Sequence, residues 1–506
     1  MPEATSGSIS EAAAGTVLIA GAGPAGLVLA LELSRRGVPH RLVEAADAPF
    51  PGSKGKGLQP RTQEVFDDLG VIEAIHAKGS PYPPMTTWEN GEPGPDWEMM
   101  TRGEPTPNTP YAEPWLLPQS RTQEVLRDRL RELGGRVEFG VRLKEFEQDE
   151  GGVTAELTGP SGTSERVRAS YLVAADGGRS TVRAALGTPF TGETVDPTPM
   201  LTADMEMEGL PRTHWHTWNS HPGGVVAMCP LPHSNLFQTY VRFEAGDPDP
   251  APEAVRRLVA ERTGLQPGKV HWASAFRTRA AMAERFREGR VFLTGDAAHI
   301  HSPAGGQGLN TSIQDAYNLG WKLAAVIQRD APDALLDSYE AERLPVAAGV
   351  LGLSTRIHRG GTTGPLSGHR GPDNHQLGLG YRESPLSVER REGLEERALR
   401  AGDRAPDAPC KDARTGETRR LFDVFRGTHF TLLGVGDVEL PVVGGALATS
   451  VKAYRVGGPT PDLLDPEGYA ARAYGERGFF LIRPDGYVGV ASGDLADVLG
   501  YWGVGG

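Results

Sequence analysis

The residues with the clearest chemical meaning form a glycine turn, Gly21-Ala-Gly23-Pro-Ala-Gly26, between an apolar run and an apolar helix pattern. Gly21 permits a sharp turn, Gly23 leaves room for a pyrophosphate beside the backbone, and Gly26 allows close packing of the helix on the strand. The start of such a helix presents free N–H groups and a partial positive charge to phosphates. The turn therefore predicts a dinucleotide site formed by Gly21, Gly23, Pro24, Ala25 and Gly26.

Glu44 stands at the end of the next apolar run, where its carboxylate can accept hydrogen bonds from the ribose hydroxyls of an adenosine. A lone glycine pattern is weak evidence, because glycines also mark ordinary turns. The apolar runs on both sides and the acid at the right distance favour the dinucleotide interpretation.

A second apolar run, residues 290–294, ends in Gly295-Asp296 and is followed by a Pro/Gly loop at residues 302–308. A long amphipathic helix begins at about Leu309. This places another carboxylate and another helix start where an anionic ligand can bind. The two strand ends, far apart in the chain, suggest one elongated ligand that spans both. A separate second phosphate site is the alternative.

Several other polar residues have two interpretations. Lys54, Lys56 and Arg61 either form a solvated loop face, which the stretch alone favours, or clamp a phosphate or the edge of an isoalloxazine ring. His299 and His301 resemble metal ligands, but no third ligand stands at a familiar spacing, so we expect a structural role and no metal site.

The two cysteines and an aromatic cluster carry less information. Cys229 and Cys410 lie far apart, so they imply neither a disulfide framework nor a thiolate metal site. The cluster His214, Trp215, His216 and Trp218 either packs one sheet face on its neighbour, which we favour, or lines a pocket for a flat substrate.

The elements that must position these residues follow from periodicity. The 506 residues suggest about three domains. Apolar residues at helical spacing predict helices over 61–69 and within 116–135, the second ending at Gly134, and alternation predicts a small antiparallel meander over 137–174. Several antiparallel strands with a helix at 251–263 follow within residues 190–275. Residues 80–114 lack periodicity, residues 355–400 are typical of a linker or covering segment, and strands and helices alternate again after residue 402.

Charge and composition restrict the partners and the location. The formal net charge is −13, and lysines and arginines are spread along the chain, which argues against nucleic acid and an anionic membrane surface as partners. Residues 12–31 are uncharged, but their Gly, Ala, Thr and Pro content fits a strand, turn and helix better than a membrane span. The first ten residues lack the basic start of a signal peptide. We therefore expect a soluble, cytoplasmic protein.

Three ordered motifs together carry a resemblance. The turn GAGPAG with Glu44, the stretch AADGGRSTVR, and the Gly-Asp motif in LTGDAAHIHSPAGGQGLN resemble those of class A flavin-dependent aromatic hydroxylases, which have the p-hydroxybenzoate hydroxylase fold. GDRAPD and RPDGYVG are similar to motifs of the larger members, phenol hydroxylase and the hydroxylases of aromatic polyketide, and hence antibiotic, biosynthesis.

The resemblance implies an α/β fold with a Rossmann-like FAD-binding domain, an inserted antiparallel-sheet substrate domain and a C-terminal thioredoxin-like domain. The expected limits are 1–185 and 279–400 for the FAD-binding domain with its linker, 186–278 for the substrate domain, and 401–506 for the last domain. That last domain contains no CxxC, so a dithiol role within it is excluded. We expect it to serve packing or dimer contact, which makes a homodimer one candidate assembly.

The resemblance also assigns cofactor contacts. FAD would be held by the glycine turn and Glu44 at its adenosine end and by Gly295 and Asp296 at its ribitol. The remaining expected contacts are Gln119, the motif residues Asp176, Gly177 and Arg183 linked to both FAD and nicotinamide nucleotide, and the loop residues Pro303, Gly308, Leu309 and Asn310. Pro303, Gly305 and Gly306 are candidates for shaping the flavin site.

Two cations in the connection after Glu44 need separate treatment. Lys54 stands where many members have an arginine, and lysine keeps the charge but loses the planar fork of a guanidinium. The resemblance therefore gives Lys54 and Arg61 as candidate cofactor contacts, with Arg61 the better match.

The implied reaction uses NADPH or NADH to reduce FAD and O2 to form a C4a-hydroperoxyflavin, which hydroxylates a phenolic or polycyclic aromatic substrate. No second GxGxxG unit is present for the nicotinamide nucleotide, in agreement with the family. Two alternatives stay open: Baeyer–Villiger oxygenation of a related ketone, and a non-catalytic flavoprotein that binds a reactive intermediate. A halogenase is disfavoured because no GWxWxIP-like motif is present.

Overall fold

The glycine turn lies at the centre of a six-stranded, mainly parallel sheet in the computed structural model, which describes residues 10–11, 15–328, 331–360, 370–441 and 450–502. The strand order is β19-β20-β13-β2-β3-β9. Strand β2 is buried on both faces, as expected for a parallel strand covered by helices. The strands are β2 (Val17–Ala20), β3 (His40–Glu44), β9 (Val137–Phe139), β13 (Tyr171–Ala174), β19 (Arg287–Glu288) and β20 (Val291–Leu293).

Helix α1 (Pro24–Arg35) packs between the long helix α7 (Gly308–Gln328) and α4 (Gln119–Glu132), so both predicted helix starts belong to one layer. The apolar residues of α1 are almost wholly buried there. Helix α2 (Pro60–Asp68) and strand β4 (Gly57–Leu58) contact α7, and α3 (Ile72–Lys78) contacts α4. The short strand β8 (Trp115–Leu116) pairs with both β4 and β5 (Ser80–Pro81), and α5 (Thr181–Leu186) follows β13.

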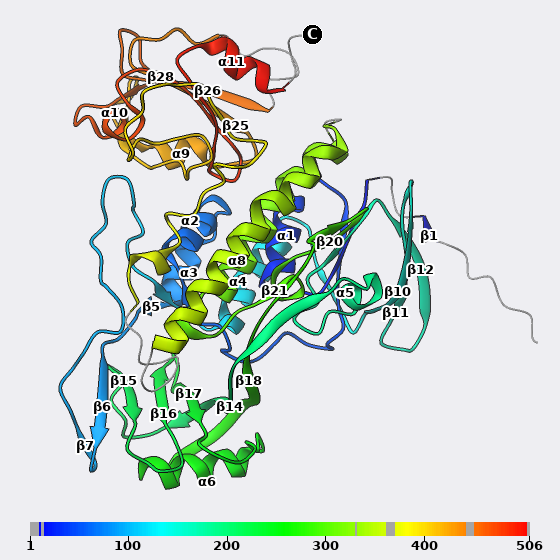
Figure 1. Ribbon diagram of the computed structural model, residues 1–506, viewed down its shortest axis with the longest axis vertical. Helices are drawn as coiled ribbons and strands as arrows, with labels where there is room; N and C mark the ends of the chain where they lie inside the picture. Colours follow the sequence, from blue (N-terminus) through cyan, green and yellow to red (C-terminus); the bar gives the residue numbers. More distant parts are fainter. Residues whose placement is uncertain (1–9, 12–14, 329–330, 361–369, 442–449, 503–506) are drawn as a thin grey trace, which may run out of the picture.

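An eight-stranded sheet extends from the nucleotide-binding part and lies at the bottom of Figure 1. Its two long strands are paired antiparallel along most of their length, and helix α6 (Pro252–Thr263) covers one face through Val255 and Val259. The strands are β6 (Met85–Glu89), β7 (Glu92–Pro93), β14 (Phe190–Met207), β15 (Trp215–Trp218), β16 (Val226–Pro230), β17 (Leu236–Arg242), β18 (Pro267–Ala283) and β21 (His299–Ile300).

The predicted meander over 137–174 is correct only in its middle. Strands β10 (Arg142–Asp149), β11 (Gly152–Thr158) and β12 (Ser164–Ala169) pair antiparallel, with β1 (Ser10–Glu11) at the edge. Strands β9 and β13 instead pair parallel with β3 and β2. Every residue of β13 is buried, which is the pattern of a central parallel strand rather than of a half-exposed meander.

The C-terminal block contains a second eight-stranded sheet, at the top of Figure 1. Helices α9 (Leu421–Phe425), α10 (Tyr469–Tyr474) and α11 (Leu495–Leu499) accompany it. Its strands are β22 (Val388–Glu389), β23 (Pro409–Asp412), β24 (Thr418–Arg420), β25 (Phe430–Val435), β26 (Val451–Val456), β27 (Leu463–Leu464), β28 (Gly478–Ile482) and β29 (Val488–Ser492).

Helix α8 (Asp337–Gly360) joins the parts, running from beside the C-terminal block down toward the lower sheet (Figure 1). It continues into the beginning of the segment 355–400, which the sequence suggested was a linker. From α8, Glu342 accepts hydrogen bonds at 2.6 and 2.9 Å from Arg483 of the C-terminal block. This contact, buried on both sides, fixes the block on the nucleotide-binding part.

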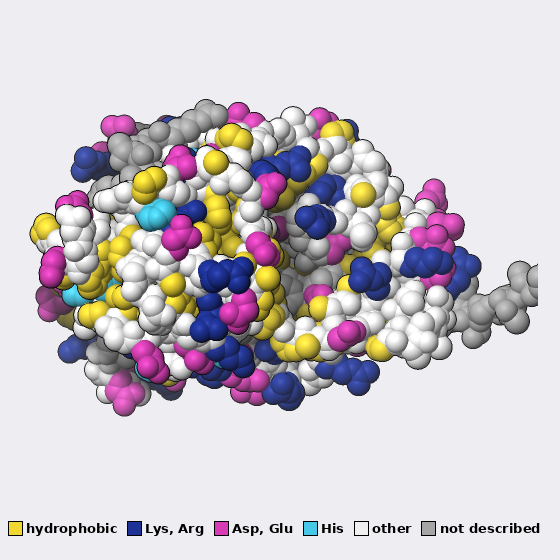
Figure 2. Space-filling view, turned by 90° about the horizontal axis from the view of Figure 1, so that it is seen from below, with side chains coloured by type: hydrophobic (Ala, Val, Ile, Leu, Met, Phe, Trp, Pro, Cys, Tyr) yellow, Lys and Arg dark blue, Asp and Glu magenta, His cyan; other side chains and the backbone are white. Residues whose placement is uncertain are grey.

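The surface agrees with the sequence charge pattern. Lys and Arg side chains are interspersed with Asp and Glu side chains over the face shown in Figure 2. Within the part of the chain that the structure describes, no helix has both the length and the apolar character that a membrane crossing requires.

Candidate functional site

The three glycines of the turn differ in what surrounds them. A Cβ on Gly21, whose φ is +103°, would lie 2.3 Å from the carbonyl oxygen of Ala175, and a Cβ on Gly26 would lie 1.9 Å from that of Gly21. Both glycines are therefore required by close backbone packing. Gly23 has an ordinary φ of −68°, and a Cβ there would meet nothing within 4 Å. Its open space is where a pyrophosphate would approach the turn.

Glu44 connects the end of β3 to this turn. One carboxylate oxygen accepts a hydrogen bond from the Ala22 N–H at 2.8 Å, and the other accepts one from Ala46 N–H at 2.9 Å. Each carboxylate oxygen keeps capacity for a further hydrogen bond, because a carboxylate offers about four acceptor positions. Glu44 is half-buried, so it is held in place and still accessible to a ribose.

The second strand end lies beside the first. A Cβ on Gly295, whose φ is +60°, would lie 3.0 Å from the Cβ of Ser312 in α7 and 3.2 Å from the Cβ of Ala25 in α1. The Gly295-Asp296 turn thus contacts the starts of both helices, and the side chain of Asp296 is half-buried. This adjacency favours one elongated ligand over two separate phosphate sites.

Asp176 and Arg183 organise the neighbouring loop. Asp176 accepts hydrogen bonds from the backbone N–H groups of Thr181 and Val182 at 2.8 and 3.3 Å, and its other carboxylate oxygen is buried without a partner among the described residues. Arg183 donates to the carbonyl oxygens of Ala297 at 2.7 Å and Gly178 at 2.9 Å. Arg183 therefore links this loop to the one after Asp296.

Three residues of the predicted flavin edge have different surroundings. Gln119 accepts a hydrogen bond from Gly55 N–H at 3.2 Å, and Lys54 is exposed. Arg61 donates to Glu64 at 2.8 Å and to the carbonyl oxygen of Asp485 at 2.7 Å. Its guanidinium, also 4.9 Å from the ring of Tyr487, serves the contact with the C-terminal block. Arg61 as a flavin contact stays a prediction, and its partners in the structure are those of the C-terminal block contact.

Asn310 fixes the loop that begins at Pro303. Its amide nitrogen donates to the carbonyl oxygens of Gly57 and Gly306, both at 2.8 Å, and its oxygen accepts from Gln59 N–H at 2.8 Å. Gly305 and Gly306 have φ values of +82° and +64°, which glycine adopts without strain. Further along, Gly308 begins α7 and the neighbouring Leu309 approaches Gly55, so this loop meets the connection after β3.

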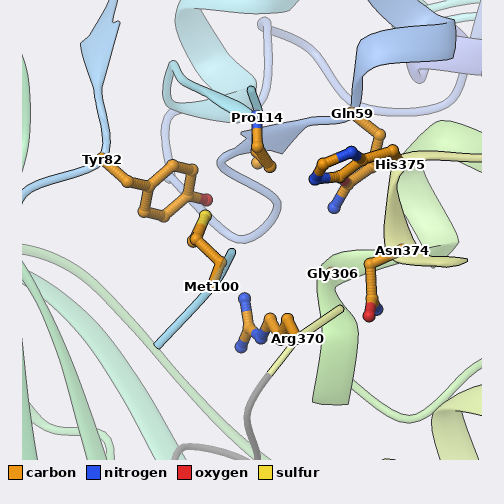
Figure 3. A pocket seen from close by; sticks show the side chains of 9 residues that line it. Gln59, Tyr82, Met100, Pro114, Gly306, Arg370, Asn374 and His375 are labelled. Atoms are coloured by element: carbon orange, nitrogen blue, oxygen red, sulfur yellow. The ribbon is translucent and has the colours of Figure 1, made fainter. Parts of the chain in front are cut away.

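A pocket borders this loop at Gly306 (Figure 3). Its cavity volume is only about 10 Å³, which is about the space of one water molecule, so an aromatic ring would enter only after the lining side chains move apart. Four buried polar atoms of its lining have no hydrogen-bond partner among the described residues, namely Gln59 Oε1, Arg370 Nε, Asn374 Nδ2 and His375 Nε2. Buried polar groups ordinarily have hydrogen-bond partners, so four unpartnered groups around one cavity favour it as a binding site. The other lining residues are Gly57, Tyr82, Met100 and Pro114.

Sequence reasoning missed most of this lining. Tyr82, Met100 and Pro114 come from the aperiodic segment 80–114, and Arg370, Asn374 and His375 come from the segment taken as a linker. Neither segment has a motif or a periodic pattern that would have indicated a pocket. Only tertiary contacts bring the two segments together, through backbone hydrogen bonds between Arg370 and both Met99 and Thr101.

The aromatic cluster divides between two faces. Trp215 stacks on Tyr82, with 6.3 Å between the ring centres, in the apolar layer that also contains Met100 of the pocket. Trp218 stacks on Trp88 on the opposite face of the sheet, with 5.7 Å between the ring centres, in the apolar cluster that also includes residues of α6. The packing interpretation holds for Trp218, whereas Trp215 lies behind the pocket wall.

His299 and His301 form a buried hydrogen-bonded chain rather than a metal pair. His299 bonds to Asp315 at 2.6 Å and to His301 at 2.9 Å, and Arg343 donates to Asp315 at 2.7 Å. Burial lowers the pKa of His301 well below its usual value. No group of three potential metal ligands occurs among the described residues. Cys229 and Cys410 are both buried free thiols.

Comparison with known proteins agrees with this geometry. Residues 15–354 match the family described as "FAD binding domain", and residues 399–500 match "Aromatic-ring hydroxylase, C-terminal". The chain belongs to the FAD-dependent aromatic hydroxylases. This membership confirms the resemblance seen in the sequence, and the fold class with it.

Several relatives of the hydroxylase align with nearly the whole length of its chain. A flavin-dependent monooxygenase of Mycobacteroides abscessus is 45% identical over 96% of this chain and 99% of its own. A 12-dehydrotetracycline 5-monooxygenase/anhydrotetracycline 6-monooxygenase of Streptomyces rimosus is 36% identical over 93% and 94%. The crystal structure of the monooxygenase PieE with FAD and substrate superposes with a TM-score of 0.83, at 28% identity over 97% and 98%. The hydroxylase is therefore a monooxygenase by family, while its individual cofactor contacts and domain limits stay predictions.

Proposed function

We propose that this hydroxylase uses FAD, NADPH or NADH, and O2 to add one oxygen atom to a phenolic or polycyclic aromatic substrate bound in the pocket beside Gly306. The observation that carries the proposal is the position of this pocket. It borders the glycine loop expected to hold the isoalloxazine ring, and four unpartnered polar atoms converge on it. A ring bound there would lie next to the redox-active part of the cofactor.

The residues of the nucleotide-binding part fit FAD. The open space at Gly23 suits the pyrophosphate, and the Glu44 carboxylate suits the adenosine ribose. Asp296, beside the starts of α1 and α7, suits the ribitol. The start of α7 after Gly308 would stabilise negative charge on the ring system, because the first N–H groups of a helix lack internal partners.

FAD, when bound, supplies the electron transfer from the nicotinamide nucleotide and the activation of O2. The protein supplies position and solvent exclusion. Asn310 holds the glycine loop against Gly57, and Tyr82 and Met100 form an apolar wall opposite Gly306. The balanced reaction consumes one aromatic C–H, O2, NAD(P)H and a proton, and yields the hydroxylated ring, NAD(P)⁺ and water.

Incubation of purified holoenzyme with NADPH and a panel of phenols, quinones and tetracyclic aromatic polyketides tests the proposal. The substrates named for the relative from Streptomyces rimosus belong in that panel. We expect substrate-dependent NADPH consumption and a product heavier by one oxygen atom. Consumption without any oxygenated product across the panel would contradict the proposal, and no consumption above a slow background would favour a non-catalytic binder.

A further inference from the structure

Arg370 is a buried cation aimed into the pocket. Its side chain points from the linker-like segment toward Met100 and Tyr82 (Figure 3), and the residue is only 8% exposed. Its backbone is held on both sides, because its N–H donates to Met99 and its carbonyl oxygen accepts from Thr101. Among the described residues no carboxylate forms an ion pair with it, and its Nε has no hydrogen-bond partner. The adjoining residues 361–369 contain no Asp or Glu.

Lys56 is a second buried cation, and it lies behind the apolar wall that Tyr82 and Met100 form. Its ammonium donates to the side-chain oxygen of Gln238 and lies 4.3 Å from the ring centre of Trp215 and 5.0 Å from that of Tyr240. No ion pair to Lys56 is present within the described part of the chain. Asp204 influences it from a greater distance, but its carboxylate is engaged by Ser53, whose N–H donates to it at 2.7 Å.

The remaining acidic groups around the two cations stay neutral near pH 7. Burial raises the pKa of the Cys229 thiol to about 11 and that of Tyr240 to about 12. Burial also raises the pKa of Tyr82. Of the described groups that act on these two cations, only Asp204 is a carboxylate.

Several other buried cations among the described residues are paired with a carboxylate, whereas Arg183 donates to two backbone carbonyl oxygens instead. Lys322 contacts Glu342 at 2.7 Å, and Arg343 contacts Asp315 at 2.7 Å. A buried charge without a partner is costly, and a protein retains one where a ligand completes the pair. A guanidinium is especially suited to an oxyanion, because it donates in a fixed fork.

We propose that the substrate binds as an anion, with an ionised oxygen (a phenolate, an enolate or a carboxylate) on its aromatic skeleton held by Arg370, and with Lys56 stabilising the same negative charge. This inference rests on the proposed function, since it concerns the substrate of that pocket. It narrows the substrate class to aromatic acids, and it makes Arg370 the specificity-determining residue.

Matched pairs of neutral and acidic aromatics test the inference on the holoenzyme. The probes are 2-naphthoate, anthracene-2-carboxylate and anthraquinone-2-carboxylate, each with its methyl ester, and the dissociation constants are measured by titration calorimetry. The variants are Arg370→Gln, Arg370→Lys, Lys56→Gln and, as a control, Arg391→Gln, which removes a cation paired with Glu389 away from the pocket.

We expect the wild type and Arg391→Gln to bind at least one acid about tenfold or more tightly than its ester. Arg370→Gln should lose this preference without weakening ester binding, Arg370→Lys should keep part of it, and Lys56→Gln should reduce it. Should Arg370→Gln not fold, the other two variants still decide the matter.

Equal binding of acid and ester by the wild type, an undiminished preference in Arg370→Gln, or no binding of any probe would overturn the inference. Failure of the proposed function looks different: the acid preference would persist while no aromatic compound is oxygenated. Oxygenation of neutral aromatics without any acid preference would leave the proposed function in place and remove only this inference.

Discussion

Replacing Gly23 with alanine should separate FAD binding from folding. The backbone at Gly23 has a φ of −68° and a ψ of −177°, which alanine adopts without strain. A Cβ there meets no protein atom within 4 Å. The apoprotein should therefore be unaffected or more stable by about 0.4–1 kcal/mol, because alanine restricts the unfolded chain. The added methyl group would occupy the space needed by the pyrophosphate.

In Gly23→Ala we expect FAD binding to weaken by about the free energy of one hydrogen bond to a charged group, which is about 1.5–3 kcal/mol. This corresponds to a roughly ten- to hundredfold higher dissociation constant for FAD. Gly26→Ala is the matched control, since its Cβ would lie 1.9 Å from the Gly21 carbonyl oxygen. That variant should lose stability by about 1–3 kcal/mol or more through overpacking, before any ligand is added.

Two measurements suffice for each variant: thermal unfolding of the apoprotein, and titration of the apoprotein with FAD followed by flavin fluorescence. Wild-type affinity for FAD in Gly23→Ala would refute the placement of the pyrophosphate at this turn. Unfolding of Gly23→Ala without ligand would refute the claim that its surroundings are open.

Three further predictions follow from buried groups. Arg483→Met should lower the free energy of unfolding in urea by about 3–5 kcal/mol, because it leaves Glu342 and Asp485 without their shared cation; a loss below 1 kcal/mol would contradict the importance of this contact. Cys410→Ser should leave turnover unchanged at equal FAD content, since a lone buried thiol has no dithiol partner in its block, and a large loss would show otherwise. Burial lowers the pKa of Lys56 to about 8 from 10.5, so Lys56 loses its proton at a lower pH in the folded protein than in the unfolded chain. Relative to Lys56→Met, the free energy of unfolding of the wild type should therefore rise by up to about 3 kcal/mol between pH 8 and 10.5. Parallel dependence of the unfolding free energy on pH in the two proteins would contradict this.

The nucleotide-binding part could be predicted because its requirements are local. The turn at Gly21, the short distance to Glu44 and the Gly295-Asp296 strand end each express a backbone constraint within a few residues. Such constraints leave a readable residue pattern, and the structure brings these elements together as expected. The pairing of β9 and β13 was wrong because short apolar strands look alike whether they enter a parallel or an antiparallel sheet.

The pocket could not be predicted because its residues meet only through tertiary contacts. Tyr82 and Arg370 lie in segments without periodicity, and nothing in either segment indicates the other. The partners of Arg61 could not be predicted for a related reason. Its sequence surroundings fit a flavin clamp equally well, whereas its actual partners, Glu64 and Asp485, depend on where the C-terminal block packs.

The origin of the oxygen atom in the product tests the central claim most directly. Purified holoenzyme, NADPH and an accepted aromatic substrate would be incubated under ¹⁸O₂ in ordinary water, and in parallel under ordinary O₂ in H₂¹⁸O. We predict a hydroxylated product that carries one labelled atom in the first reaction and none in the second. A ring-expanded lactone with label from O₂ would favour Baeyer–Villiger oxygenation instead. A product labelled from water alone would contradict a monooxygenase reaction at this site.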